Sequence, residues 1–136
     1  MKYLILLFLL FFINVDTVFG QSNAYQELKY LLIDRGYSVS TEKYGYLTKG
    51  ESAGYSKTFY ANTTYVIVAL STSSSVQDVD VQLLDSDGTV LARDTDSNVL
   101  AVVEYTPRVS RTMRAVMKNY ASYSGSHKCQ LIIFYK

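Results

Sequence analysis

The chain has 136 residues and a formal net charge of +1, so it is long enough for one domain with a buried core but too short for two. Its 13 lysines and arginines are balanced by 12 aspartates and glutamates, which argues against nucleic acid as a partner, because that binding requires basic side chains clustered on one face. The strongest basic cluster, Arg108, Arg111, Arg114 and Lys118, fits a helix stripe or a strand whose charges face water. Cys129 is the single cysteine, so packing rather than an internal disulfide must stabilise the fold.

The segment Met1 to Gly20 has the pattern of a signal peptide. Lys2 precedes an apolar run from Tyr3 to Ile13, and Val18-Phe19-Gly20 ends the segment with residues that signal peptidase accepts. An apolar core of about eleven residues is too short to span a bilayer, which takes roughly 20. We therefore expect a secreted or periplasmic protein that begins near Gln21 and has no stable insertion in a membrane. A retained N-terminal anchor is the alternative.

The segment from Gln21 to Gly36 predicts an amphipathic helix. Ser22-Asn23 supplies a polar cap, and Gln26 lies where its side chain reaches back to that cap. Gly36 suits a left-handed position at the C-terminal end. We expect the helix over about Asn23 to Arg35, packed on the rest of the domain through one apolar face, which contains Tyr25, Leu28, Leu31 and Leu32.

From Tyr37 to Lys136 the sequence predicts strands and turns only. β-branched residues and tyrosines alternate with polar residues, and stretches rich in Gly, Ser, Asn and Asp separate the runs. Short strands at spacings near ten residues are typical of a sandwich or jelly roll. We predict a mostly β, jelly-roll-like β-sandwich of about eight strands with one N-terminal α-helix. The expected strands are Tyr37–Leu47, Tyr55–Tyr60, Thr64–Leu70, Val79–Leu84, Val90–Asp94, Val99–Tyr105, Thr112–Lys118 and Cys129–Tyr135.

Aspartates concentrate in the middle of the chain. Asp78 and Asp80 alternate with valines, so both carboxylates project from the same strand face, and Asp94 and Asp96 follow in a nearby loop. Carboxylate oxygens from two segments are the ligands that calcium requires, and these four residues form a candidate calcium site, although the spacing does not match an EF-hand. Solvated carboxylates on a strand face are the alternative. The run Asp85 to Gly88 predicts a hairpin turn.

Catalytic residues are scarce in this sequence. His127 is the only histidine, and it lies two residues from Cys129. A catalytic cysteine and its base normally come from separate elements, so that a third group can orient the base. No nucleophile elbow, zinc-protease motif or phosphate-binding glycine loop is present. We expect no enzymatic activity, and Cys129 is interpreted as a small buried apolar residue of the last strand.

Tyrosine is the dominant aromatic residue, with 13 copies and no tryptophan. Tyrosine rings supply rigid contact area at low entropic cost, which suits recognition of sugars or extended peptides. Four tyrosines on two strands that we expect to be neighbours form the candidate ligand face: Tyr44, Tyr46, Tyr55 and Tyr60. The alternative is that these residues are good strand formers whose rings pack while their hydroxyls stay wet.

Three segments together resemble the bacterial pre-peptidase C-terminal domain family: Phe59 to Ala69, Asp78 to Gly88, and Val102 to Pro107. The similarity extends over about Gly50 to Lys136. It implies a jelly-roll-like β-sandwich, usually appended to secreted proteases, with polymer or matrix binding and calcium dependence in some relatives. The Asp-x-Asp pair of that family falls on Asp78 and Asp80. The chain departs from the pattern at Asn62 and from Ser110 to Met113, and no peptidase precedes the matching segment.

Together these features predict an exported, non-catalytic binding or structural module that recognises an extracellular polysaccharide or protein. The alternative is a periplasmic inhibitor or chaperone-like partner of a secreted protein, and a hydrolase is the less favoured third class.

Overall fold

The computed structural model describes residues 18–136 of the chain. The greater part of the predicted signal peptide, residues 1–17, lies outside the described residues. The described part comprises one helix followed by eight strands, and every predicted strand is present. The elements are α2 (Val18–Asp34), β1 (Ser38–Leu47), β2 (Ser52–Phe59), β3 (Tyr65–Ser71), β4 (Val76–Asp85), β5 (Val90–Asp94), β6 (Leu100–Tyr105), β7 (Arg111–Ser122) and β8 (His127–Tyr135).

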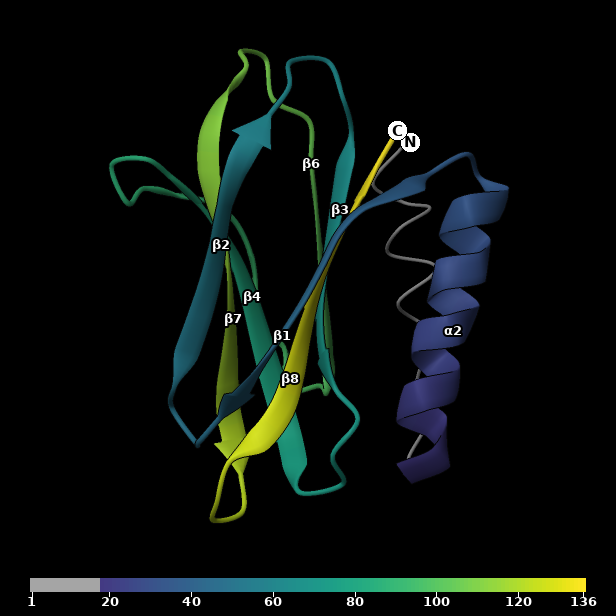
Figure 1. Ribbon diagram of the computed structural model, residues 1–136, viewed down its shortest axis with the longest axis vertical. Coiled ribbons are helices and arrows are strands. Elements are labelled where there is room, and N and C mark those ends of the chain that lie inside the picture. Colours follow the sequence, from purple (N-terminus) through teal and green to yellow (C-terminus); the bar gives the residue numbers. More distant parts are fainter. Residues whose placement is uncertain (1–17) are drawn as a thin grey trace.

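The strands form two four-stranded sheets (Figure 1), which we call sheet A, in the order β1-β8-β3-β6, and sheet B, in the order β2-β7-β4-β5. All pairs are antiparallel, and they are nested: β4 pairs with β5, β3 with β6, β2 with β7 and β1 with β8. The eight strands therefore form one long antiparallel hairpin whose turn lies between β4 and β5. This hairpin is folded over so that its strand pairs are distributed between the two sheets. This is the jelly-roll form of the β-sandwich, and it confirms the predicted fold.

The main core lies between the two sheets. Each strand contributes alternate residues to it, because successive side chains of a strand point to opposite faces. Phe59, Ile67, Leu83 and Ile133 are fully buried there. Central strand β3 is buried along its whole length, which shows that its outward residues are also covered.

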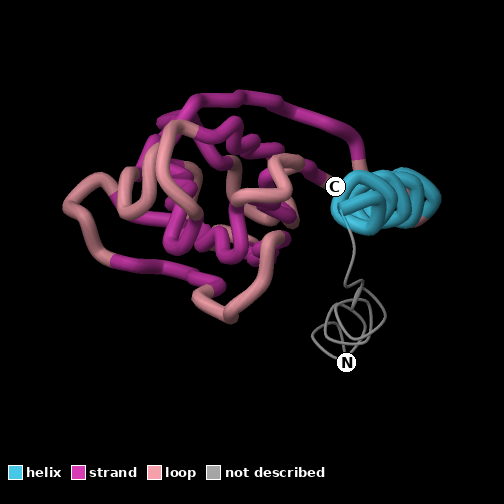
Figure 2. Tube along the Cα trace, turned by 90° about the horizontal axis from the view of Figure 1, so that it is seen from below, coloured by secondary structure: helices cyan, strands magenta, loops and turns pink. Residues whose placement is uncertain are grey.

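Helix α2 covers the outer face of sheet A and creates a second core (Figures 1 and 2). Leu28 and Leu32 of the helix pack against outward-facing residues of β3, β6 and β8, among them Val68 and Phe134. The molecule therefore has three layers in the order helix, sheet A, sheet B. The predicted packing of the helical apolar face on the domain is confirmed for Tyr25, Leu28 and Leu32, whereas Leu31 is only half-buried and is not part of this core.

The two ends of α2 differ in how well the sequence predicts them. The helix begins at Val18 rather than near Asn23. At its C-terminal end, Gly36 adopts a φ of 92° and donates to the carbonyl of Ile33 at 2.9 Å, and Tyr37 donates to Leu32 at 2.9 Å. Such a left-handed residue closes the last turn of a helix, as predicted. Within residues 18–136, no helix is long and apolar enough to cross a membrane.

Candidate functional site

Two of the four predicted ligand-face tyrosines come together on the outer face of sheet A. Tyr44 and Tyr46 alternate along β1, so both point away from the core. Their side chains are 66% and 63% exposed, and the rings meet edge to face with centroids 6.4 Å apart. The ammonium of Lys128 on β8 lies 4.7 Å from the centre of the Tyr44 ring, within cation–π range. We call Tyr44, Tyr46 and Lys128 the tyrosine patch.

The other two predicted tyrosines lie elsewhere. Tyr55 packs against the core between the sheets, and the Lys43 ammonium of β1 lies 4.9 Å from its ring centre. Tyr60 is exposed. It follows Phe59, the last residue of β2, and therefore lies at the end of that strand which is far from the β1–β2 connection. The four residues therefore do not share one face, because β1 and β2 belong to different sheets rather than being hydrogen-bonded neighbours.

The candidate calcium residues surround the beginning of β4. Asp78 and Asp80 are only 7% and 8% exposed, and one carboxylate oxygen of each, Oδ1, is buried with no hydrogen-bond partner. Register irregularities on both sides of Asp78 place it beside Ala121 of β7. The loop after β5 approaches this strand, since Val79 donates to the carbonyl of Asn98 at 2.8 Å.

Burial determines the charge state of these two carboxyl groups. It raises the pKa of Asp78 to about 6, with further raising by the charges of Asp80, Asp94 and Asp96. Burial also raises the pKa of Asp80, while the Lys118 ammonium acts in the opposite direction. The charged forms of Asp78 and Asp80 are therefore costly without a cation.

The side chains do not form a ready calcium site in this arrangement. Both oxygens of Asp94 are engaged, Oδ1 by the amide of Asp96 at 3.1 Å and Oδ2 by the amide of Val102 at 2.9 Å. Among the described residues, no group of three or more His, Cys, Asp or Glu side chains is arranged to hold a metal ion. Calcium binding by these four residues stays a prediction.

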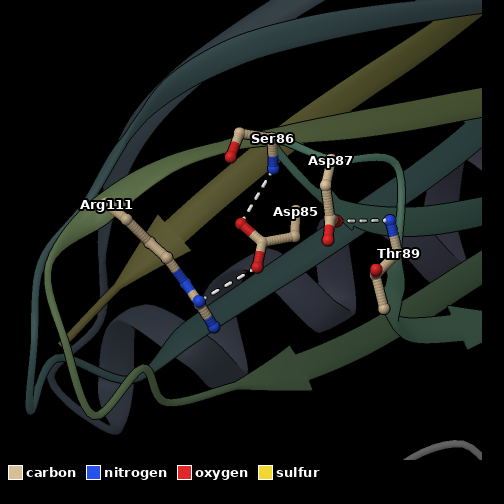
Figure 3. Close-up of polar contacts among 5 residues, drawn as sticks. All are labelled: Asp85, Ser86, Asp87, Thr89 and Arg111. Atoms are coloured by element: carbon tan, nitrogen blue, oxygen red, sulfur yellow. Dashed lines mark hydrogen bonds and ion pairs between the residues drawn. The ribbon is translucent and has the colours of Figure 1, made fainter.

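The run from Asp85 to Thr89 forms the predicted hairpin turn between β4 and β5 (Figure 3). Asp85 accepts from the Ser86 amide at 2.8 Å, and Asp87 accepts from the Thr89 amide at 2.9 Å. Gly88 has a φ of 86°, which a glycine adopts without strain. Arg111 forms an ion pair with Asp85 at 2.9 Å. Asp85 and Asp87 therefore stabilise the turn by accepting hydrogen bonds from its amides.

His127 joins two loops at the end of the sandwich where β8 begins. Its Nε2 faces the carbonyls of Tyr123 and Ser124 at 3.2 and 3.3 Å, and its Nδ1 lies 3.2 Å from the Ser73 hydroxyl. Carbonyls only accept, so Nε2 carries the proton and Nδ1 accepts from Ser73 in the neutral ring. The histidine therefore connects the β7–β8 loop to the β3–β4 loop, a structural use of both nitrogens.

Cys129 lies in the core between the sheets and is fully buried. Its thiol points to the carbonyl of His127 at 3.7 Å, and burial raises its pKa. A thiol in such surroundings is inert, because the reactive form is the thiolate. The interpretation of Cys129 as a small buried apolar residue is confirmed.

Sequence reasoning missed two contributors to these sites. Lys128 joins the tyrosine patch only because β8 pairs with β1, with Tyr46 opposite Lys128. Ser73 supports His127 across loops that are far apart in the sequence. Both contacts depend on the order of the strands in the sheets, and local residue patterns do not indicate that order.

The comparisons with known proteins concern the fold. No protein-family model matches the sequence, and no curated protein sequence matches it. The chain is similar to the crystal structure of Aeromonas hydrophila PliG, a periplasmic lysozyme inhibitor of g-type lysozyme, with a TM-score of 0.51, 14% identity, and coverage of 75% of this chain and 90% of that one. A second similar structure is a de novo designed double-stranded β-helix, with a TM-score of 0.38, 14% identity, and coverage of 71% of this chain and 100% of that one.

Proposed function

We propose that the chain is an exported, non-catalytic β-sandwich protein that binds and inhibits another protein outside the cytoplasm, and that a g-type lysozyme is the first target to test. The likeness in fold to PliG over 90% of that inhibitor's chain carries the proposal. The residues of this chain agree with it, because the only histidine is used to join two loops and the only cysteine is buried.

The tyrosine patch supports protein binding over polymer binding. Aromatic rings that recognise sugars present open faces, whereas Tyr44 and Tyr46 meet edge to face and Lys128 covers one ring. Tyrosine is enriched at protein interfaces and among the residues that carry most of their binding energy. Retention on a polysaccharide column that is lost in Tyr44→Ala would favour the polymer-binding alternative instead.

The test measures inhibition directly. The mature chain is titrated into a purified g-type lysozyme that is clearing a suspension of bacterial cell walls. We expect the clearing rate to fall in proportion to added chain and to approach zero near equimolar protein if the affinity is nanomolar. A c-type lysozyme is the matched control enzyme, and its rate should not change. An unchanged g-type rate at tenfold excess of the chain would contradict the proposal.

The non-catalytic part of the proposal has its own test. His127→Ala should weaken loop order without removing a chemical step, so inhibition should persist when binding is measured below the melting temperature. A hydrolytic activity of the chain that disappears in His127→Ala would instead support the hydrolase alternative.

A further inference from the structure

The outer edge of β1 is the longest strand edge that the described residues leave open. β1 lies at the end of sheet A, and β8 is its only hydrogen-bonded neighbour within residues 18–136. The strand has ten residues, and only Leu47 is buried. The edge strand on the other side of the same sheet, β6, has three buried residues among six. Figure 2 shows the strand that leaves the helix running along one side of the sandwich.

The two halves of β1 differ in how their edge is protected. In the first half the register shifts between Val39 and Thr41, and the Lys57 ammonium of β2 donates to the Ser40 hydroxyl. Bulges and charged side chains at such positions prevent edge-to-edge pairing. The second half, from Glu42 to Leu47, keeps regular register with β8. The carbonyl of Leu47 accepts from the Asn119 side chain at 3.1 Å. Among the described residues, no other amide or carbonyl of this half has a hydrogen bond outside the strand ladders.

The side chains that flank this regular half are aromatic and cationic. Tyr44 and Tyr46 stand on its outer side with Lys128, and Lys43 lies on its inner side over Tyr55. Neither lysine forms a salt bridge with any described residue. The one carboxylate on the strand, Glu42, is already held by Lys29 at 3.6 Å and by the Tyr25 hydroxyl at 3.2 Å.

We propose that Glu42 to Tyr46 of β1 is a docking site at which an extended acidic segment of a partner protein adds as a further strand of sheet A. The free backbone edge supplies the main-chain hydrogen bonds of strand addition. The tyrosine patch packs against the side chains on one face of the added strand, and Lys43 pairs with the carboxylates on the opposite face. The inference rests on the proposed function in one respect, that the chain acts by binding a protein.

Charge decides between this occupant and a second copy of the chain. Pairing β1 with the β1 of another copy would bring the Lys43 side chains of both copies to one edge. Like charges close together across paired strands are destabilising. An acidic strand meets the same lysines with opposite charge, so the edge favours it.

The experiment uses two capped peptides of about seven residues, one that alternates valine with glutamate and one with lysine in place of glutamate. Each is titrated into the mature chain while backbone amide NMR signals are recorded. We expect the glutamate peptide to shift the signals of β1 and β8, and the lysine peptide to bind at least tenfold more weakly. The double variant Tyr44→Ala/Tyr46→Ala should weaken binding of the glutamate peptide by about tenfold. The variant Tyr60→Ala, which removes another exposed tyrosine, should leave that binding unchanged.

Three outcomes would overturn the inference: equal binding of both peptides, shifts outside β1 and β8, or dimerisation of the chain through β1 in the absence of peptide. Hydrogen exchange in the presence of the g-type lysozyme separates this inference from the proposed function. If the lysozyme binds and the β1 amides exchange as before, the docking site is wrong and the function stands. If the lysozyme does not bind and the glutamate peptide docks on β1, the proposed target is wrong and the docking site stands.

Discussion

The outer faces of the two sheets differ although both belong to one sandwich. The outer face of sheet A is apolar where α2 covers it, with Val68, Ile132 and Phe134 buried beneath the helix. On sheet B, small or polar residues of β2 such as Ser56 stand beside Arg114 of β7, with no helix over them among the described elements. A single helix covers only one sheet, so the sequence makes only that sheet apolar on both faces.

The largest expected effect comes from removing a buried side chain from the core between α2 and sheet A. Phe134→Ala removes a fully buried ring from the core under α2 and should lower the free energy of unfolding by about 3–5 kcal/mol. Val116→Ala on the outer side of β7, opposite Gly54, is the matched control and should cost no more than about 1 kcal/mol. Urea unfolding measures both. Equal losses would mean that the two faces do not differ in burial as described.

The second prediction concerns the acidic residues at the beginning of β4 in sheet B. If calcium binds Asp78, Asp80, Asp94 and Asp96, it binds the folded state only, and a calcium concentration of about 100 times the dissociation constant adds roughly 2.7 kcal/mol of stability. Melting curves in chelator and in millimolar calcium measure the effect, and Asp80→Ala should abolish it. Asp87→Ala in the hairpin turn is the control that should retain it. Identical curves would leave these aspartates as structural and surface residues.

The third prediction gives the pH dependence of the same region. The pKa of Asp78 is raised from 3.8 to about 6, chiefly by burial, so its protonated form is favoured in the folded state. Its contribution to stability is fully present below pH 3.8 and is lost as the pH rises through about 6. Asp78→Asn, which keeps the shape without the charge, should stabilise the protein at neutral pH by about 1 kcal/mol.

Unfolding free energies of the wild type and of Asp78→Asn across pH 4 to 8 test this sign. The difference between the two proteins should grow as the pH rises from 4 through about 6 and then level off. A difference that is constant with pH would show that Asp78 has the same protonation equilibrium in the folded and unfolded states.

The sequence predicts the strands well because their signals are local. Alternating β-branched residues and turn residues define each strand, and the four-residue turn from Asp85 to Gly88 contains its own hydrogen-bond acceptors and its own glycine. The apolar face of the helix also predicts packing on the domain, because Leu28 and Leu32 need an apolar surface to cover them. Elements whose cause lies within a few residues are therefore predictable.

The candidate site is less predictable because strand order creates it. Tyr55 follows β1 closely in the sequence, yet it lies on the other sheet, while Lys128 is distant in the sequence and touches Tyr44. Jelly-roll wrapping pairs the first strand with the last, so the neighbours of Tyr44 and Tyr46 come from the end of the chain. Alternation within a strand indicates which side a residue occupies, and it contains no information about the neighbouring strand.

The smallest predicted effect concerns a hydrogen bond between α2 and the exposed edge of sheet A. The Tyr25 hydroxyl donates to Glu42 at 3.2 Å, and burial, followed by the charge of Glu42, raises the pKa of Tyr25 to about 12. Tyr25→Phe should cost about 1 kcal/mol, and Tyr30→Phe, at a ring that is 69% exposed, should cost nothing measurable. The Tyr25 contribution should be fully present below pH 10 and lost as the pH rises through about 12. If Tyr25→Phe is as stable as the wild type at neutral pH, the hydrogen bond between Tyr25 and Glu42 contributes nothing measurable to the packing of α2 on sheet A, and the apolar contacts and the Lys29–Glu42 ion pair hold the helix.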